Sequence, residues 1–253
     1  MKGIYQVKDS GDFQRVKELG FDTVIADIGQ ESILMESGLN ILVQINPDWD
    51  FEKTVRELDP SPQVIGYYLP DEPNMDPYIT PESLALTVAK IKKISQKPVC
   101  VCIANINSGR DYVEWKRCGA DILFADIYPY KANPEHWYRK FWEQELIAQG
   151  KLAGRIFRFF YGWWRCFEDS FRMKKAVKAD YPVGTIAVLQ CFGGKDNSGS
   201  ERKFYLPNKN ELERLMRCWK NLGVTDFVSF VWESDIHNGI KENQWMAEIV
   251  NKE

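Results

Sequence analysis

Short apolar runs alternate with amphipathic stretches along almost the whole chain. The apolar runs are rich in β-branched and aromatic residues, as strands are, and the stretches between them carry apolar residues at helical spacing. This alternation indicates repeated strand–helix units around a parallel sheet. The expected strands are Gly3–Val7, Thr23–Ile28, Ile41–Asn46, Val64–Leu69, Val99–Ala104, Ile122–Tyr128, Thr185–Phe192 and Phe227–Trp232.

Helical patterns fill the segments between these strands. The clearest is Asn210–Leu222, where Leu212, Leu215, Met216 and Trp219 recur on one face. Eight strand–helix units in 253 residues predict a single-domain (β/α)8 TIM barrel over residues 1–253, and neither G-x-G-x-x-G nor G-x-x-x-x-G-K occurs to favour an open nucleotide-binding sheet. The expected helices are Asp12–Leu19, Glu31–Ser37, Phe51–Leu58, Glu82–Ser95, Asp111–Cys118, one or two within Glu135–Ala179, Asn210–Leu222 and Gln244–Asn251.

Composition and charge remove several classes of function. With 33 basic and 36 acidic residues the chain has no basic surplus for binding nucleic acid. No apolar run approaches the roughly 18 residues that cross a bilayer, and no signal peptide follows Met1, so we expect a cytoplasmic protein if Met1 is native. The two histidines, His136 and His237, are too few for a polyhistidine zinc centre, and we expect no cofactor. The six cysteines are expected to be free thiols.

Polar and aromatic residues gather where the expected strands end. In a TIM barrel these positions form the catalytic rim. Carboxylates, amides and aromatic rings are the groups that handle sugars, since rings stack on sugar faces and paired carboxyls divide acid and base work. The residues at these ends are Asp27, Asp71, Glu72, Asn105, Asp126, Tyr128, Gln190, Trp232 and Glu233.

The segment Val64–Pro73, which reads VIGYYLPDEP, resembles the strand-4 segment of clan A TIM-barrel glycoside hydrolases, where Asn-Glu-Pro carries the general acid/base. It is more similar still to glycosidase-like barrels that read Gly-Tyr-Tyr-Leu-x-Asp-Glu-Pro. Asp-x-Tyr-Pro at 126–129 and Gln-x-Phe-Gly at 190–193 follow in the order found in those barrels. The resemblance implies that Glu72 is the general acid/base and that Trp232 is an aromatic platform for the sugar.

Two positions depart from the clan A pattern. Asp71 stands where those enzymes have asparagine, and the seventh strand ends in Gln190, whose amide cannot replace the nucleophilic glutamate. A second catalytic carboxylate therefore comes from Asp126, the preferred candidate, or from Glu233. Asp71, Asp27, Asn105, Tyr128, Gln190 and Trp232 are the expected substrate-binding residues. Structural roles stay open for Asp27 as a cap, for Asp126 as a backbone acceptor, and for Tyr128 and Trp232 as core residues.

Two other functions remain open from the sequence. The missing strand-7 glutamate fits a carbohydrate-binding barrel without hydrolytic activity. Asp27, Asp71, Glu72 and Asp126 are also oxygen ligands of the kind that Mg²⁺ or Ca²⁺ takes, for lyase or phosphodiester chemistry. The aromatic stretch 157–171 has helical spacing and is expected to pack against the barrel or to form an oligomer contact.

Overall fold

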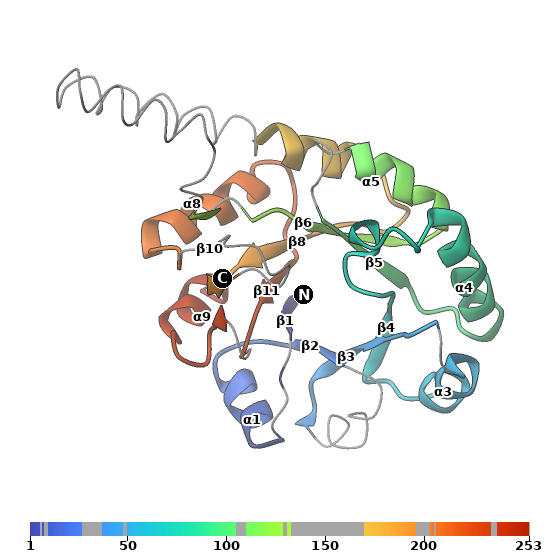
Figure 1. Cartoon of the computed structure of the whole chain (residues 1–253). Helices are drawn as coiled ribbons and strands as arrows, with labels where there is room; N and C mark the ends of the chain where they lie inside the picture. Colours follow the sequence, from blue (N-terminus) through green and yellow to red (C-terminus); the bar gives the residue numbers. More distant parts are fainter. Residues whose placement is uncertain are drawn as a thin grey trace.

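Eight parallel strands close into a barrel, and helices surround it (Figure 1). The order around the barrel is β1-β11-β8-β6-β5-β4-β3-β2, so neighbours in the sequence are neighbours in space, and the chain closes where β1 pairs with β11. The predicted (β/α)8 fold is confirmed. This computed structural model describes residues 1–5, 7, 10–26, 37–47, 50–104, 110–128, 131–132, 170–195, 203–204, 206–233 and 237–252.

The eight barrel strands coincide with the eight expected ones, to within a few residues at each end. The last strand stops two residues before its expected end at Trp232, which places Trp232 in the connection that follows. The strands are β1 (Lys2–Tyr5), β2 (Thr23–Ala26), β3 (Asn40–Gln44), β4 (Val64–Tyr68), β5 (Val99–Ala104), β6 (Ile122–Asp126), β8 (Gly184–Gln190) and β11 (Phe227–Phe230).

The helices also follow the sequence pattern where they are described, and residues 170–178 are helical. Residues 31–36 of the helix expected at 31–37, and most of the segment 135–179, lie outside the described residues. In the described part of the chain, no helix is both long and apolar enough to cross a membrane. The helices are α1 (Ser10–Glu18), α3 (Phe51–Leu58), η1 (Pro73–Met75), α4 (Pro81–Ile94), α5 (Arg110–Trp115), η2 (Lys116–Cys118), α8 (Lys209–Lys220) and α9 (Trp245–Val250).

Two hydrophobic clusters lie on opposite sides of the strands. Because side chains alternate along a strand, every second residue points into the barrel and the others point toward the helices. In β6, Ile122 and Phe124 belong to the inner cluster, whereas Leu123 and Ala125 belong to the outer one. The same alternation turns Asp126 inward at the end of the strand.

A small antiparallel sheet, not expected from the sequence, joins three connections beyond the barrel strands. Its order is β12-β9-β10-β7, with β7 following β6, both β9 and β10 following β8, and β12 following β11. Strands of two or three residues carry no periodic signal, which is why the pattern misses them. The strands are β7 (Lys131–Ala132), β9 (Gly193–Lys195), β10 (Lys203–Phe204) and β12 (His237–Asn238).

Candidate functional site

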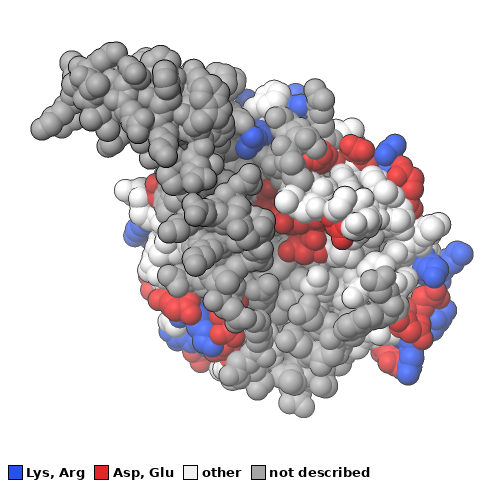
Figure 2. Space-filling view, in the orientation of Figure 1, with Lys and Arg blue, Asp and Glu red and all other residues white. Residues whose placement is uncertain are grey.

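Acidic side chains meet at the carboxyl ends of β4 and β6. Asp71 and Glu72 follow β4, and Asp126 ends β6. Since the strands are parallel, these ends lie at the same mouth of the barrel. Figure 2 shows acidic side chains in a hollow near the centre of the face that it draws.

Glu72 occupies a left-handed backbone conformation immediately before η1, with φ 45° and ψ 51°. A residue with a side chain adopts this conformation at a cost of about 1–2 kcal/mol. The turn is held in place by Asn74, whose amide donates to Ala104 O at 2.7 Å and accepts from Ala104 N at 2.9 Å. The fixed turn therefore holds Glu72 at the mouth in a strained conformation, a feature that is common at functional sites.

Asp126 is 5% exposed and shares a hydrogen bond with Glu72. Burial raises the pKa of Asp126 well above its ordinary value, and the hydrogen bond and negative charge of Glu72 add to the effect. A hydrogen bond with Tyr128 opposes the rise in this pKa. Oδ1 of Asp126 is buried without a hydrogen-bond partner among the described residues. The protonated form of Asp126 is therefore favoured, and its carboxyl lies within hydrogen-bonding reach of a second one.

Asp71 directly precedes Glu72 in the chain and accepts a hydrogen bond from the Tyr68 hydroxyl at 2.5 Å. Its surroundings raise the pKa of Asp71 to about 6, mainly by removing water, while the Tyr68 bond opposes the rise and the charge of Glu72 adds to it. The residue keeps an exposed surface at the mouth, so solvent moderates this desolvation. Three carboxyl groups from two strand ends thus influence one another.

Aromatic rings form one wall of the mouth. Tyr128 packs edge-on against Phe192 with ring centroids 5.0 Å apart, and Phe192 packs against Phe230 at 5.2 Å. Tyr128 and Phe230 are half-buried and lie 6.0 Å apart. Phe230 was not singled out from the sequence, although its inward position at the end of the last barrel strand could have identified it.

Trp232 and Glu233 belong to a separate cluster. Trp232 is 1% exposed in the outer hydrophobic core, and its indole N–H donates to Asp12 Oδ2 at 3.0 Å. Lys241 bridges the carboxylates of Glu233, at 2.7 Å, and Asp12, at 2.8 Å. Because its ring is buried and its N–H is paired, Trp232 does not offer a face to a sugar here, and Glu233 forms an ion pair with Lys241 rather than a contact with Glu72.

The remaining expected residues divide into one described and two undescribed. Gln190 is fully buried at the inward-facing end of β8, and its amide donates to Phe192 O at 3.5 Å. Asp27 and Asn105 lie outside the described residues. No group of three or more acidic, cysteine or histidine side chains that could hold a metal ion occurs within the described ranges.

Cys102, also missed from the sequence, lies beneath the acidic residues. It is 1% exposed and hydrogen-bonds with Tyr68 and with Asp71. Burial raises the pKa of the thiol, followed by the charges of Asp71 and Asp126, so Cys102 is neutral. A cysteine in an apolar run reads as a core residue, and only the barrel geometry places it under the mouth.

Comparison with known proteins supports the fold through structure. No family model matches the chain, and no curated protein matches it by sequence. A glycoside hydrolase-like protein is similar in structure over 98% of this chain and 93% of its own, with a TM-score of 0.57 and 10% identity. The GH99 endo-alpha-mannosidase from Bacteroides thetaiotaomicron matches over 89% of this chain and 67% of its own, with a TM-score of 0.53 and 11% identity. A chitinase from Chromobacterium violaceum matches over 100% and 99%, with a TM-score of 0.51 and 9% identity. At these identities the likeness shows the TIM-barrel fold alone.

Proposed function

We propose that the protein is a glycoside hydrolase in which Glu72 is the general acid/base and Asp126 is the second carboxyl of the reaction. The observation that carries the proposal is the hydrogen-bonded pair Glu72–Asp126 at the mouth of the barrel. The substrate is a glycoside or oligosaccharide, whose ring faces the half-buried rings of Tyr128 and Phe230, which pack against the buried ring of Phe192. The fold shared with structures of glycoside hydrolases supports this class of reaction.

The pair supplies the proton that cleavage of a glycosidic bond requires. The raised pKa of Asp126 keeps a proton on this carboxyl, and the hydrogen bond passes it to Glu72. Glu72 then protonates the leaving-group oxygen as the bond between that oxygen and the anomeric carbon breaks, and the bonding electrons stay on the oxygen. Water adds its hydroxyl to the anomeric carbon and returns its proton to Glu72.

The hydrogen bond with Glu72 is the basis of the role that we propose for Asp126. Carboxyls on opposite faces of a sugar ring are separated by about 5 Å in retaining enzymes and by roughly 6.5–9.5 Å in inverting ones. The hydrogen bond between Asp126 and Glu72 is instead that of two carboxyls that share a proton. Asp126 accordingly serves as the proton partner of Glu72.

A carbohydrate-binding barrel without hydrolytic activity is the second candidate. It is favoured by one observation: β8 ends in the buried amide Gln190, where clan A enzymes, which the sequence resembles, carry a nucleophilic glutamate. Asp71 and Tyr128 would then bind sugar hydroxyls without turnover.

The test is a screen of aryl glycosides and natural oligosaccharides for release of reducing sugar by the wild type, Glu72→Gln and Asp126→Asn. We expect wild-type turnover and a loss of about 10²-fold or more in Glu72→Gln, the usual contribution of general acid–base catalysis. Glu82→Gln is the matched control, because Glu82 lies on α4 and pairs with Arg117 at the surface. Turnover unchanged in Glu72→Gln contradicts the proposal, and sugar binding without cleavage in the wild type favours the second candidate.

A further inference from the structure

We infer that Tyr68 and Tyr5 are positioning residues: a buried chain of two tyrosine hydroxyls keeps Asp71 ionised beside the Glu72–Asp126 pair, and the charge of Asp71 strengthens the pair's hold on its proton. The inference rests on the proposed function, since it assigns a role in proton transfer to groups that do not touch the substrate. It is carried by the hydrogen bonds inside the barrel.

The chain runs in one direction. The Tyr68 hydroxyl donates to Asp71 Oδ1 at 2.5 Å, and the Tyr5 hydroxyl lies 2.5 Å from the Tyr68 hydroxyl. Tyr68 has one hydroxyl proton, and the bond to Asp71 uses it. Tyr5 is therefore the donor in the second bond, and both donations point toward Asp71.

The two rings are locked by packing. Tyr5 is 5% exposed and Tyr68 is fully buried, and their rings meet edge-on at 5.7 Å. Tyr5 also packs against Phe230 at 5.5 Å, and Tyr68 packs against Phe124 at 5.3 Å. Phenylalanine would fill the same space without bringing a polar group into the apolar interior, where an unpaired hydroxyl is unfavourable. The hydroxyls are therefore explained by the carboxylate that they reach.

The charge of Asp71 affects the protonation of the nearby Glu72–Asp126 pair. Tyr68 from β4 and Cys102 from β5 hydrogen-bond to Asp71, as does the backbone N–H of Glu72, and the charge of Glu72 lies beside it. The ionised form of Asp71 in turn raises the pKa of Asp126, which faces it from β6. Burial raises the pKa of the Tyr128 hydroxyl, and the charges of Asp126, Glu72 and Asp71 raise it further. Without the hydrogen bond from Tyr68, Asp71 would thus stay neutral to a higher pH, and the pKa of Asp126 would fall.

The direct test is an NMR titration of the aspartate carboxyl carbons in ¹³C-labelled wild type and Tyr68→Phe, with Asp71→Asn and Asp126→Asn to assign the signals. In Tyr68→Phe we expect the midpoint of Asp71 to rise by about one pH unit and that of Asp126 to fall. Tyr5→Phe should shift both midpoints in the same directions by a smaller amount. No substrate is needed for this measurement.

Tyr67→Phe is the matched control. Tyr67 adjoins Tyr68 on β4 but faces outward, and its hydroxyl donates to Asp59 Oδ1 at 3.0 Å. The Tyr67→Phe variant loses one tyrosine–aspartate hydrogen bond elsewhere in the protein, so a general destabilisation of the fold would appear in this variant as well. The inference expects the midpoints of Asp71 and Asp126 to stay at the wild-type values in this variant.

The catalytic readout is the pH profile of kcat/KM on a substrate from the screen. In Tyr68→Phe the basic limb should move to lower pH, while kcat at the optimum stays within a few-fold of the wild type. Unchanged midpoints of Asp71 and Asp126 in Tyr68→Phe overturn the inference. Shifted midpoints in a protein that hydrolyses no glycoside leave the tyrosine–aspartate link standing and overturn the proposed function instead.

Discussion

The acidic residues at the two ends of the barrel differ in their hydrogen-bond partners. At the mouth, Asp71, Glu72 and Asp126 lie together, and Asp126 Oδ1 is left without a partner among the described residues. At the other end, Asp59 accepts hydrogen bonds from Tyr67 and Ser95, and Asp121 pairs with Lys92 at 2.7 Å and accepts from Val99 N at 3.0 Å. Carboxylates at that end are paired with donors, as expected for groups that stabilise the fold.

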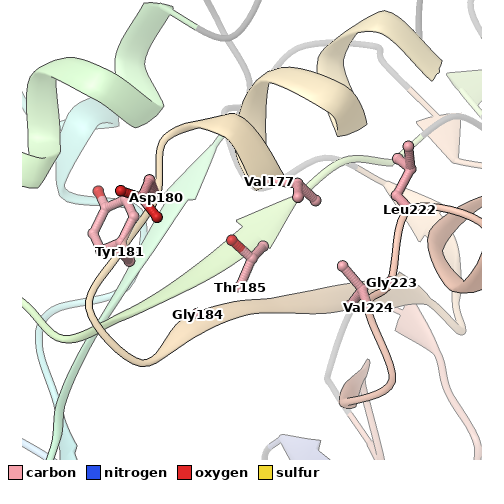
Figure 3. Close-up of a pocket in the computed structure, with 8 residues that line it drawn as sticks. All are labelled: Val177, Asp180, Tyr181, Gly184, Thr185, Leu222, Gly223 and Val224. Atoms are coloured by element: carbon pink, nitrogen blue, oxygen red, sulfur yellow. The ribbon is translucent and has the colours of Figure 1, made fainter.

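A cavity of about 210 Å³ at the starts of β8 and β11 makes the contrast sharper (Figure 3). Apolar side chains and glycines make up most of its lining, and Asp180 and Tyr181 contribute its ionisable groups. The Tyr181 hydroxyl is already used, since it donates to Tyr112 O at 3.0 Å. A hollow alone does not make a site: among the described residues around this cavity no acidic pair meets, whereas at the mouth like charges are crowded at the expense of stability. The cavity is lined by Val177, Asp180, Tyr181, Gly184, Thr185, Leu222, Gly223 and Val224.

The first prediction concerns how stability depends on pH at the mouth. Asp126 has a raised pKa in the folded state, so the folded protein keeps a proton that the unfolded chain releases above about pH 4. Its contribution to stability is full below that pH and is lost as the pH rises toward the folded-state pKa, at up to about 1.4 kcal/mol per pH unit. Urea unfolding of Asp126→Asn from pH 4 to 8 should lack this loss, so the variant gains on the wild type as the pH rises. A constant difference between the two proteins would contradict the prediction.

The second prediction concerns the opposite end. Asp59→Ala removes the acceptor of the Tyr67 and Ser95 hydroxyls, and we expect it to lower the free energy of unfolding by about 2 kcal/mol. Turnover at a temperature where the variant is folded should match the wild type. Glu57→Ala, at a side chain on α3 that is 64% exposed, is the control and should change stability little. Loss of turnover in folded Asp59→Ala would erase the difference between the two ends.

The third prediction concerns the strained turn. Glycine adopts left-handed conformations freely, so Glu72→Gly should raise the free energy of unfolding by about 1 kcal/mol while it abolishes turnover. Glu72→Gln removes the same charge but keeps the strain. Comparing the two variants by thermal unfolding separates backbone strain from charge repulsion, and equal stability of the two would show that the conformation stores no strain.

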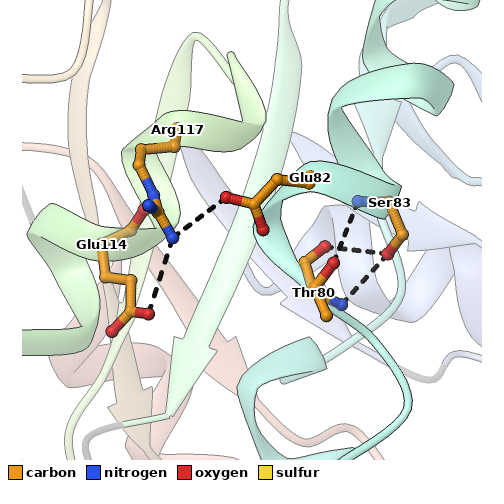
Figure 4. A network of polar contacts seen from close by, with 5 residues as sticks. All are labelled: Thr80, Glu82, Ser83, Glu114 and Arg117. Carbon is orange, nitrogen blue, oxygen red and sulfur yellow. Dashed lines mark hydrogen bonds and ion pairs between the residues drawn. The ribbon is translucent and has the colours of Figure 1, made fainter.

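The fourth prediction concerns the outer surface, where we expect the smallest changes in stability. Arg117 reaches Glu82 at 3.0 Å and Glu114 at 3.7 Å between α4 and η2 (Figure 4). All three side chains are more than half exposed, so Arg117→Ala should change stability by less than about 1 kcal/mol. Thr80→Ala removes the cap that accepts from Ser83 N at 3.1 Å and should cost about 1 kcal/mol. Thermal unfolding of both variants tests this order, and a larger loss in Arg117→Ala would reverse it.

The barrel could be predicted from the sequence because each strand is a run of apolar residues long enough to show its period. The position of Glu72, Asp71 and Asp126 at one mouth followed from the same pattern, since the carboxyl ends of parallel strands share one edge. Their roles in catalysis remain predictions. The hydrogen bond between Glu72 and Asp126 was not predictable, because a spacing along the chain gives no distance across the barrel.

Other parts of the site were hidden by the pattern that revealed the fold. Tyr5, Tyr68 and Cys102 lie in apolar runs and look like ordinary core residues, and only the closed barrel brings their polar atoms toward Asp71. The wall residue on the last strand was predicted to be Trp232, but the strand ends at Phe230 and Trp232 turns into the outer core. The side to which a residue points cannot be extrapolated beyond the end of a strand.

The small sheet β12-β9-β10-β7 has a consequence for engineering the protein. It ties the connections after β6, β8 and β11 to one another, and a Cβ at Gly193 would lie only 2.7 Å from Leu206 N, so there is little slack between them. A loop grafted or lengthened in one of these connections would have to be redesigned together with the other two. Attempts to change what the protein accepts should therefore begin outside these three connections and outside the turn that carries Glu72.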